Sequence, residues 1–255
     1  MNDELQNNGI KKPIVFSVLL TILILVFPVV SGAIITIFKF GELRSRLIQA
    51  LAFIIAGIIG CIIAKLKFGS LKDVGLKIVH ISDLKDYLWF APIILVEILP
   101  FFAGLKSGLN QSLILAYVLF TIAVGFAEEL YFRGLIANSF KKTISLVLFS
   151  SFLFSIGHIM NLLAGASIFD TALQIVFAFL FRIVAVEISF TTKSLVIPIL
   201  WHTAHNFISL VTASNDGKWS LIIAIAQGTI LLIYGIYLWV KKINTASILR
   251  IKKEI

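Results

Sequence analysis

The sequence predicts an all-α, polytopic membrane protein in which about eight transmembrane helices form one bundle around an intramembrane polar cavity. Of its 255 residues, 59% are hydrophobic and only 14% are charged, against about 45–50% and 25% in soluble domains. The apolar residues form long runs, which is typical of membrane helices. Inside several runs, charged and polar side chains recur, and these suggest a polar interior.

Eight runs approach the roughly 20 residues that a helix needs to span a bilayer. They lie at about 14–37, 46–65, 85–104, 111–139, 143–160, 167–190, 194–213 and 219–240. We predict one membrane domain, residues 1–255, whose motif-bearing core covers about 110–210. The first run has no small-residue cleavage site after it, so we expect a retained helix rather than a signal peptide. The single cysteine, Cys61, permits no disulfide within one chain and is expected to pack among apolar residues.

Basic residues predict the orientation of the bundle. The net charge of +9 comes from short clusters between apolar runs, a pattern that orients membrane helices, so we expect a lipid bilayer as partner and no nucleic acid. The loop with Lys39, Arg44 and Arg46 violates the pattern, and the connection 65–85, which includes His80, is expected at the membrane interface. Alternate segments are basic, which predicts a multi-pass cell-membrane protein with cytoplasmic N- and C-termini: Lys11, Lys12, Lys65, Lys67, Lys72, Lys77, Lys141, Lys142, Lys193, Lys241, Lys242, Arg250, Lys252 and Lys253.

Two adjacent glutamates, Glu128 and Glu129, interrupt the fourth run. Charged side chains within a membrane are costly and usually face a cavity or a partner. Glu129 and Arg133 are four residues apart on one helix face, which predicts an internal ion pair. Glu128 points about 100° away, so it is the freer carboxylate and the better candidate for chemistry. A purely structural ion network between helices is the alternative.

Polar groups on three predicted helices lie at overlapping depths. At 1.5 Å per residue, Glu128 lies roughly 20 Å from the basic rim, and His158 roughly 24 Å along the next helix. His202 and Asn206 lie roughly 14 and 20 Å along theirs and share a face. His205 lies to the other side of His202, where a supporting or packing role is expected. Three further charges are expected to be structural partners or cavity-lining groups rather than catalysts: Glu97, Arg182 and Glu187.

One carboxylate, two histidines and an amide are sufficient parts for hydrolysis. A carboxylate and a histidine can take a proton from water, and a second histidine and an asparagine can stabilise an oxyanion. The same residue types resemble a catalytic zinc shell of Glu128, His158 and His202, but His-Glu-x-x-His is absent, so we assign no metal and keep zinc as an alternative. No serine or cysteine has a paired base. A transporter or proton relay would also use buried Glu and His, but no inverted repeat or pair of broken helices supports it.

Three motifs resemble those of the CPBP family, the CAAX proteases and bacteriocin-processing enzymes that are also called Abi proteins. The resemblance covers roughly residues 110–210, and the three motifs occur in the family's order on separate predicted helices. The motifs are Glu128-Glu129-x-x-x-Arg133, Phe154-x-x-x-His158 and His202-x-x-x-Asn206.

The resemblance implies an intramembrane glutamate-type endopeptidase of eight helices. Glu128 and His158 would activate water, His202 and Asn206 would form the oxyanion hole, and the other two residues of the first motif would support the site. The implied substrate is a peptide or protein in or near the membrane, such as a bacteriocin or signalling-peptide precursor, and some members act in self-immunity. The alternative is a non-catalytic membrane regulator or scaffold acting on a partner such as a sensor kinase.

Overall fold

The structure is a computed structural model that describes residues 10, 12–79, 91–140, 144–162, 165–213 and 217–254. This part of the chain is helical, and its one isolated β-bridge joins Leu105 to Thr212. The elements are α1 (Pro13–Phe38), α2 (Glu42–Phe68), α4 (Ala91–Ile98), η2 (Leu99–Ala103), α5 (Gln111–Glu129), the π-helix η3 (Leu130–Ile136), η4 (Ala137–Ser139), α6 (Ile144–Gly157), η5 (His158–Leu162), α7 (Ile168–Thr192), α8 (Val196–Val211) and α9 (Gly217–Glu254).

Five described helical stretches are long and apolar enough to cross a membrane: Pro13–Phe38, Glu42–Phe68, Gln111–Ser139, Ile168–Ser189 and Trp219–Val240. The shorter apolar helices Ala91–Ala103, Leu148–Leu162 and Val196–Val211 occupy the other three predicted runs. The predicted all-helical, multi-pass class is therefore confirmed, whereas a count of eight spans stays a prediction. His80 and the rest of 80–90 lie outside the described residues, as do Lys11, Lys141 and Lys142.

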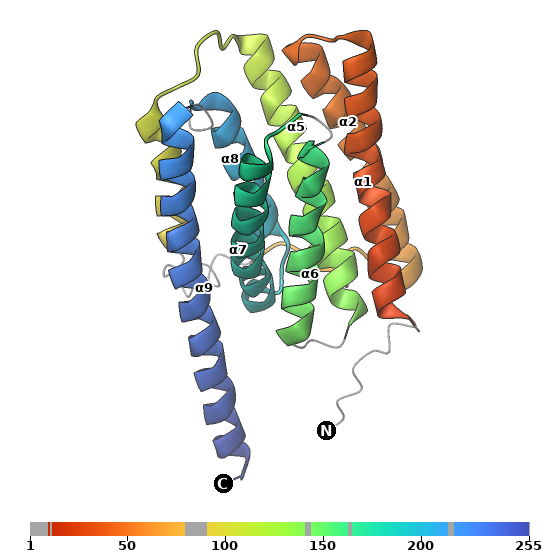
Figure 1. Cartoon of the computed structure of the whole chain (residues 1–255). Coiled ribbons are helices and arrows are strands. Elements are labelled where there is room, and N and C mark those ends of the chain that lie inside the picture. Colours follow the sequence, from red (N-terminus) through yellow and green to blue (C-terminus); the bar gives the residue numbers. More distant parts are fainter. Residues whose placement is uncertain are drawn as a thin grey trace.

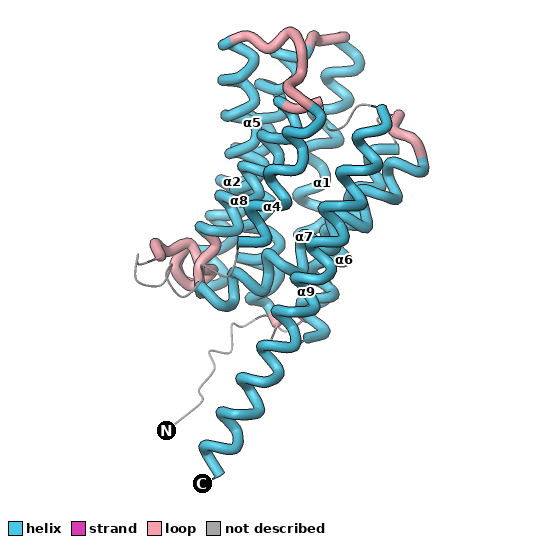
Figure 2. Tube along the Cα trace, turned by 90° about the vertical axis from the view of Figure 1, so that its left-hand side faces the viewer, coloured by secondary structure: helices cyan, strands magenta, loops and turns pink. Residues whose placement is uncertain are grey.

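The helices form one bundle, with α1 and α2 at one side, α9 at the other, and α5 to α8 between them (Figure 1). Within it α2 packs on α5, α5 on α8, α6 on α7, and α7 on α9. The view turned by 90° shows the same helices running side by side (Figure 2). The start of α1 and the end of α9 lie at the same end of the bundle (Figure 1), an arrangement compatible with the predicted orientation.

Local sequence sets several helix ends. The Asn110 side chain accepts a hydrogen bond from Leu113 N–H (3.0 Å) and so caps α5, and Ser167 caps α7 by accepting from Asp170 N–H (3.0 Å). Such side chains satisfy backbone donors that a helix start leaves unpaired. α1 begins with Pro13, whose missing N–H costs nothing in the first turn.

Glycines bring the central helices close together. A Cβ added at Gly125 of α5 would lie 2.5 Å from Thr203 Oγ1 of α8, and one at Gly60 of α2 would lie 2.8 Å from the Tyr131 ring. Inside a membrane, helices associate through such close packing of small residues rather than through a hydrophobic driving force. The α5–η3 segment is thereby held between α2 and α8.

A cluster around Glu42 accounts for part of the exception to the charge pattern. The Glu42 carboxylate accepts hydrogen bonds from Tyr117 Oη (2.7 Å) and Lys106 Nζ (3.3 Å), and it lies 3.8 Å from Arg46. The Arg46 guanidinium also lies 5.3 Å from the centre of the Phe120 ring. The positive charge of Arg46 is therefore partly balanced by groups inside the bundle. For this reason Arg46 contradicts the predicted orientation less than a free arginine in the same loop would.

Candidate active site

The two glutamates are the last residues of α5, and the π-helix η3 begins directly after them. In η3 the Phe132 carbonyl accepts from Ala137 N–H, and it also accepts from the Ser150 hydroxyl of α6 at 3.0 Å. The Asn138 amide donates to the Gly134 carbonyl at 2.7 Å. Side chains thus satisfy the irregular backbone, and π-turns of this kind are frequent at functional sites.

Glu129 is fully buried and binds three cationic or polar side chains. It forms the predicted ion pair with Arg133. Its Oε1 also lies 2.8 Å from Arg182 Nη1 and 2.8 Å from His202 Nδ1. Three helical segments, α5–η3, α7 and α8, therefore meet at this one carboxylate.

Glu128 is the more accessible of the two carboxylates. Its side chain is 18% exposed, whereas that of Glu129 is 0% exposed. Glu128 Oε2 lies 3.2 Å from Arg182 Nη2 and 3.5 Å from His202 Nε2. The division predicted from helical rotation, with Glu129 held inside and Glu128 freer, is present in the structure.

Arg182 of α7 is part of the ionic cluster itself, which the sequence did not predict. We expected a structural partner or cavity-lining residue, but its guanidinium contacts both glutamates. It also lies 3.1 Å from the centre of the Phe154 ring, a cation–π contact that offsets part of its burial. The only signal in the sequence was a lone arginine in an apolar run, which by itself identifies no partner. Glu187 lies buried further along α7.

Phe154 explains why an aromatic residue precedes the histidine of the second motif by one helical turn. Its ring meets the His158 ring edge-on at 5.1 Å and the His202 ring edge-on at 6.2 Å. The two predicted histidines are thus gathered around one phenylalanine. Within the described residues, His158 makes no hydrogen bond to Glu128, so the predicted water-activating pair is not in direct contact.

Asn206 lies one helical turn beyond His202, about 6 Å along α8. It lines a polar cavity of about 640 Å³ together with His205 and Ser209 of α8, and residues of η2, α7 and α9 complete the lining: Pro100, Asp170, Leu173, Gln174, Phe177, Ser220, Ile223, Ala224 and Gln227. Asn206 has no hydrogen bond to the glutamates in the described part of the chain. The predicted site therefore consists of a tight ionic cluster with a polar cavity one turn away.

His205 and Glu97 form a separate pair next to this cavity. His205 Nδ1 lies 3.1 Å from Glu97 Oε1, and Trp201 Nε1 donates to the same oxygen at 2.8 Å. The His205 ring stacks on Phe177 with centres 5.1 Å apart. This agrees with the expectation of a packing role for His205 and a structural partner in Glu97.

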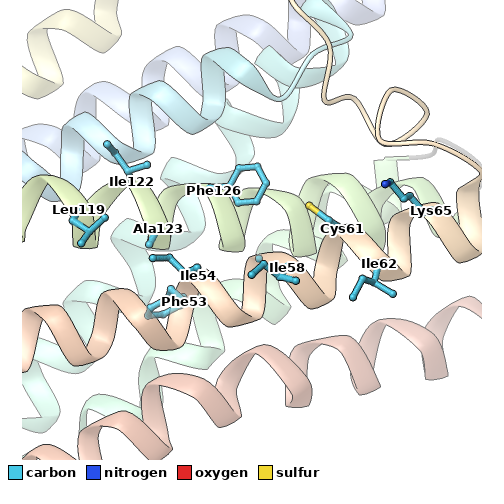
Figure 3. Close-up of a pocket in the computed structure, with 11 residues that line it drawn as sticks. Phe53, Ile54, Ile58, Cys61, Ile62, Lys65, Leu119, Ile122, Ala123 and Phe126 are labelled. Carbon is cyan, nitrogen blue, oxygen red and sulfur yellow. The ribbon is translucent and has the colours of Figure 1, made fainter.

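An apolar groove of about 460 Å³ runs between α2 and α5. Figure 3 shows its lining, with Phe53 and Phe126 from the two helices and Lys65 towards one end. Cys61 also lines the groove and is partly exposed. Neither glutamate is among the lining residues, so this groove is distinct from the ionic cluster.

The zinc alternative has no preformed ligand set in the described residues, where no group of three or more His, Cys, Asp or Glu side chains could hold a metal ion. His202 directs both ring nitrogens at carboxylates, and His158 lies against Phe154 instead of Glu128. We therefore derive no reaction step through a metal.

Comparison with known proteins assigns the segment that carries these motifs. Residues 110–208 match the family model described as type II CAAX prenyl endopeptidase Rce1-like. The matched segment contains all three motifs and nearly coincides with the predicted core, so the resemblance to CAAX proteases is confirmed. A search of curated proteins finds no match to the chain.

Proposed function

We propose, from this family match, that the protein is an intramembrane glutamate-type endopeptidase that hydrolyses a peptide bond in a membrane-associated peptide or protein. The family supports a membrane peptide hydrolase in general. The observation that carries the finer proposal is the unequal pair of carboxylates at the end of α5. Glu129 is fully enclosed by cations, while Glu128 keeps an accessible side chain beside a histidine.

Glu128 is the proposed general base. A base must reach the water that it deprotonates, and Glu128 meets this requirement because its side chain is partly exposed. His158 is its proposed partner. Since the two side chains are not hydrogen-bonded to each other, the attacking water would lie between them.

The contact with Glu129 determines which ring nitrogen of neutral His202 would carry the proton. Glu129 is paired with two arginines, which favours its ionised form, so the His202 Nδ1 proton would donate to it. A neutral imidazole carries one proton, so Nε2 would then be an acceptor that faces Glu128. To donate a hydrogen bond to an oxyanion through Nε2, as the family resemblance implies, His202 must first gain a second proton. We propose that the proton taken from water reaches Nε2 before the oxyanion forms.

The cavity beside Asn206 is the proposed substrate site. Its volume of about 640 Å³ lies within the roughly 300–1,000 Å³ of most ligand sites. Amide and carboxylate side chains in its lining can pair with the backbone groups of an extended peptide. We propose a peptide substrate, such as a bacteriocin or signalling-peptide precursor, whose scissile carbonyl approaches Asn206.

A non-catalytic regulator is the second candidate, and one observation favours it. Arg182 joins both glutamates to α7, and an ion network that ties three helices together would also suit a scaffold. The two candidates differ in whether the Glu128 carboxylate has to accept a proton.

The test is proteolysis by purified protein in detergent with candidate precursor peptides, comparing the wild type with Glu128→Gln. The amide keeps the shape of the side chain but removes the base, so cleavage should fall by about 10²–10⁴-fold. Glu42→Gln is the control, because Glu42 is another glutamate that accepts hydrogen bonds within the bundle but lies in neither the ionic cluster nor the lining of the cavity, and it should retain cleavage. Equal cleavage by wild type and Glu128→Gln would refute the proposal that Glu128 is the general base. Loss of wild-type cleavage with a chelator, restored by zinc, would favour a metallopeptidase.

A further inference from the structure

A small polar pocket of about 170 Å³ lies at the end of the bundle where lysines gather. Its volume is below the roughly 300–1,000 Å³ that suits drug-sized ligands, so only a small group fits. Three segments that are distant in sequence build it: the turn after α2, the η3–η4 segment and the α7–α8 connection.

Hydrogen bonds and close packing fasten these segments together. Leu195 N–H donates to the Gly75 carbonyl at 2.8 Å, and the Ser194 hydroxyl donates to the Lys77 carbonyl at 2.6 Å. Gly75 has φ +92°, and a Cβ there would lie 3.1 Å from Leu195 Cγ. The turn therefore needs a glycine at this position, and the pocket wall is formed before any ligand arrives.

The lining is strongly cationic. Lys72, Lys77 and Lys193 are exposed, and they form no ion pair with a carboxylate among the described residues. The acidic residue of the lining is Asp73, whose carboxylate accepts a hydrogen bond from the Ser70 hydroxyl at 2.6 Å. The lysines outnumber this carboxylate among the described lining residues, so the pocket carries a net positive charge.

Arg133 also lines the pocket, but its side chain is 0% exposed and pairs with Glu129. Its guanidinium therefore belongs to the ionic cluster, and the exposed lysines are the cations that a ligand in the pocket can reach.

We propose that this pocket binds a phosphate group, either in a lipid headgroup or as a free phosphate ion. The exposed lysines supply the positive charge and can donate charge-assisted hydrogen bonds to the phosphate oxygens. The pocket lies on the side predicted to face the cytoplasm, where anionic lipids are concentrated.

The test measures the thermal unfolding of full-length protein in detergent, and it requires no proteolysis. Two probes separate the sources: dioleoyl phosphatidic acid in the micelles, and sodium phosphate with sodium chloride at the same ionic strength as reference. A ligand that binds the folded protein raises Tm as its concentration increases. A rise with phosphatidic acid alone supports a lipid headgroup, and a rise with both supports any phosphate group.

The variant Lys72→Gln with Lys193→Gln should weaken the apparent Kd by at least about tenfold, because two charge-assisted hydrogen bonds are lost. The matched control is Lys12→Gln with Lys67→Gln, exposed lysines that do not line the pocket, and it should bind like the wild type. Both pairs of substitutions are at the surface, so unliganded Tm should be unchanged. The single variant Lys77→Gln gives a second test should the double variant prove unstable. No Tm rise in the wild type with either probe, or equal rises in all variants, would overturn the proposal.

Discussion

Removal of Arg182 should destabilise the protein more than removal of any exposed cation. Arg182 is 1% exposed and contacts both glutamates, at 2.8 Å and 3.2 Å. Arg182→Met replaces the cation with an apolar chain of similar length and leaves two carboxylates beside each other. Removing one partner of a buried ion pair typically costs about 3–5 kcal/mol, and here two carboxylates lose the same partner, so the upper part of that range is expected.

The assay is unfolding by sodium dodecyl sulfate in mixed micelles, with helical circular dichroism as readout. Arg46→Met is the matched control, because Arg46 also pairs with a glutamate, at 3.8 Å, but its side chain is 25% exposed. Exposed pairs contribute about 0–1 kcal/mol, so the control should change little. The double variant Glu128→Gln with Arg182→Met should recover about 1–3 kcal/mol of the loss, because residues in contact are energetically coupled. If Arg182→Met lowered the free energy of unfolding no more than Arg46→Met, the ionic cluster would not be what holds these helices together.

Two further predictions concern helix packing and the histidine between the carboxylates. Gly125→Ala should lower stability by about 1–3 kcal/mol, because its Cβ would lie 2.5 Å from Thr203 Oγ1; Gly32→Ala, with nothing within 4 Å, should not, and equal unfolding curves would contradict the close α5–α8 packing. His202→Gln, which can place an amide near the position of Nε2, should retain more cleavage than His202→Ala if the residue donates to an oxyanion. Equal rates for these two His202 variants would show that proton transfer, not hydrogen bonding, is its contribution.

The bundle could be predicted because apolar runs determine where helices lie in a membrane. The second predicted run, 46–65, is extended to Glu42–Phe68 in the structure. At its start Glu42 pairs with Arg46, one turn further along the helix, and with Lys106 of another segment. The fourth run, 111–139, was expected to be one helix, but it changes to a π-helix at Leu130. No residue type distinguishes this turn from an α-helix, and a hydroxyl from another helix, that of Ser150, supports it.

The part of the candidate site that lies within one helix could be predicted from helical geometry. The i, i+4 rule identified the pair of Glu129 and Arg133, and rotation identified Glu128 as the more accessible carboxylate. The involvement of Arg182 depends on how α7 packs against α6 and α8, and no spacing within a helix contains that information. The same limit applies to Phe154, whose contact with Arg182 gives the second motif a structural reason.

Adjacent glutamates resolve two opposing requirements on a carboxylate inside a membrane. A buried carboxylate is tolerated only when cations and hydrogen bonds surround it, but a general base must remain accessible to water. One side chain cannot satisfy both conditions, whereas neighbours about 100° apart on a helix can divide them. Glu129 is enclosed and pairs with both Arg133 and Arg182. Glu128 pairs with one arginine, Arg182, and stays partly exposed. His202 contacts both carboxylates. A proton that His202 gained at Nε2, next to Glu128, would therefore be stabilised by the negative charge of Glu129 next to Nδ1. In the proposed mechanism Glu129 would therefore be a positioning residue, and its negative charge would support the protonated His202.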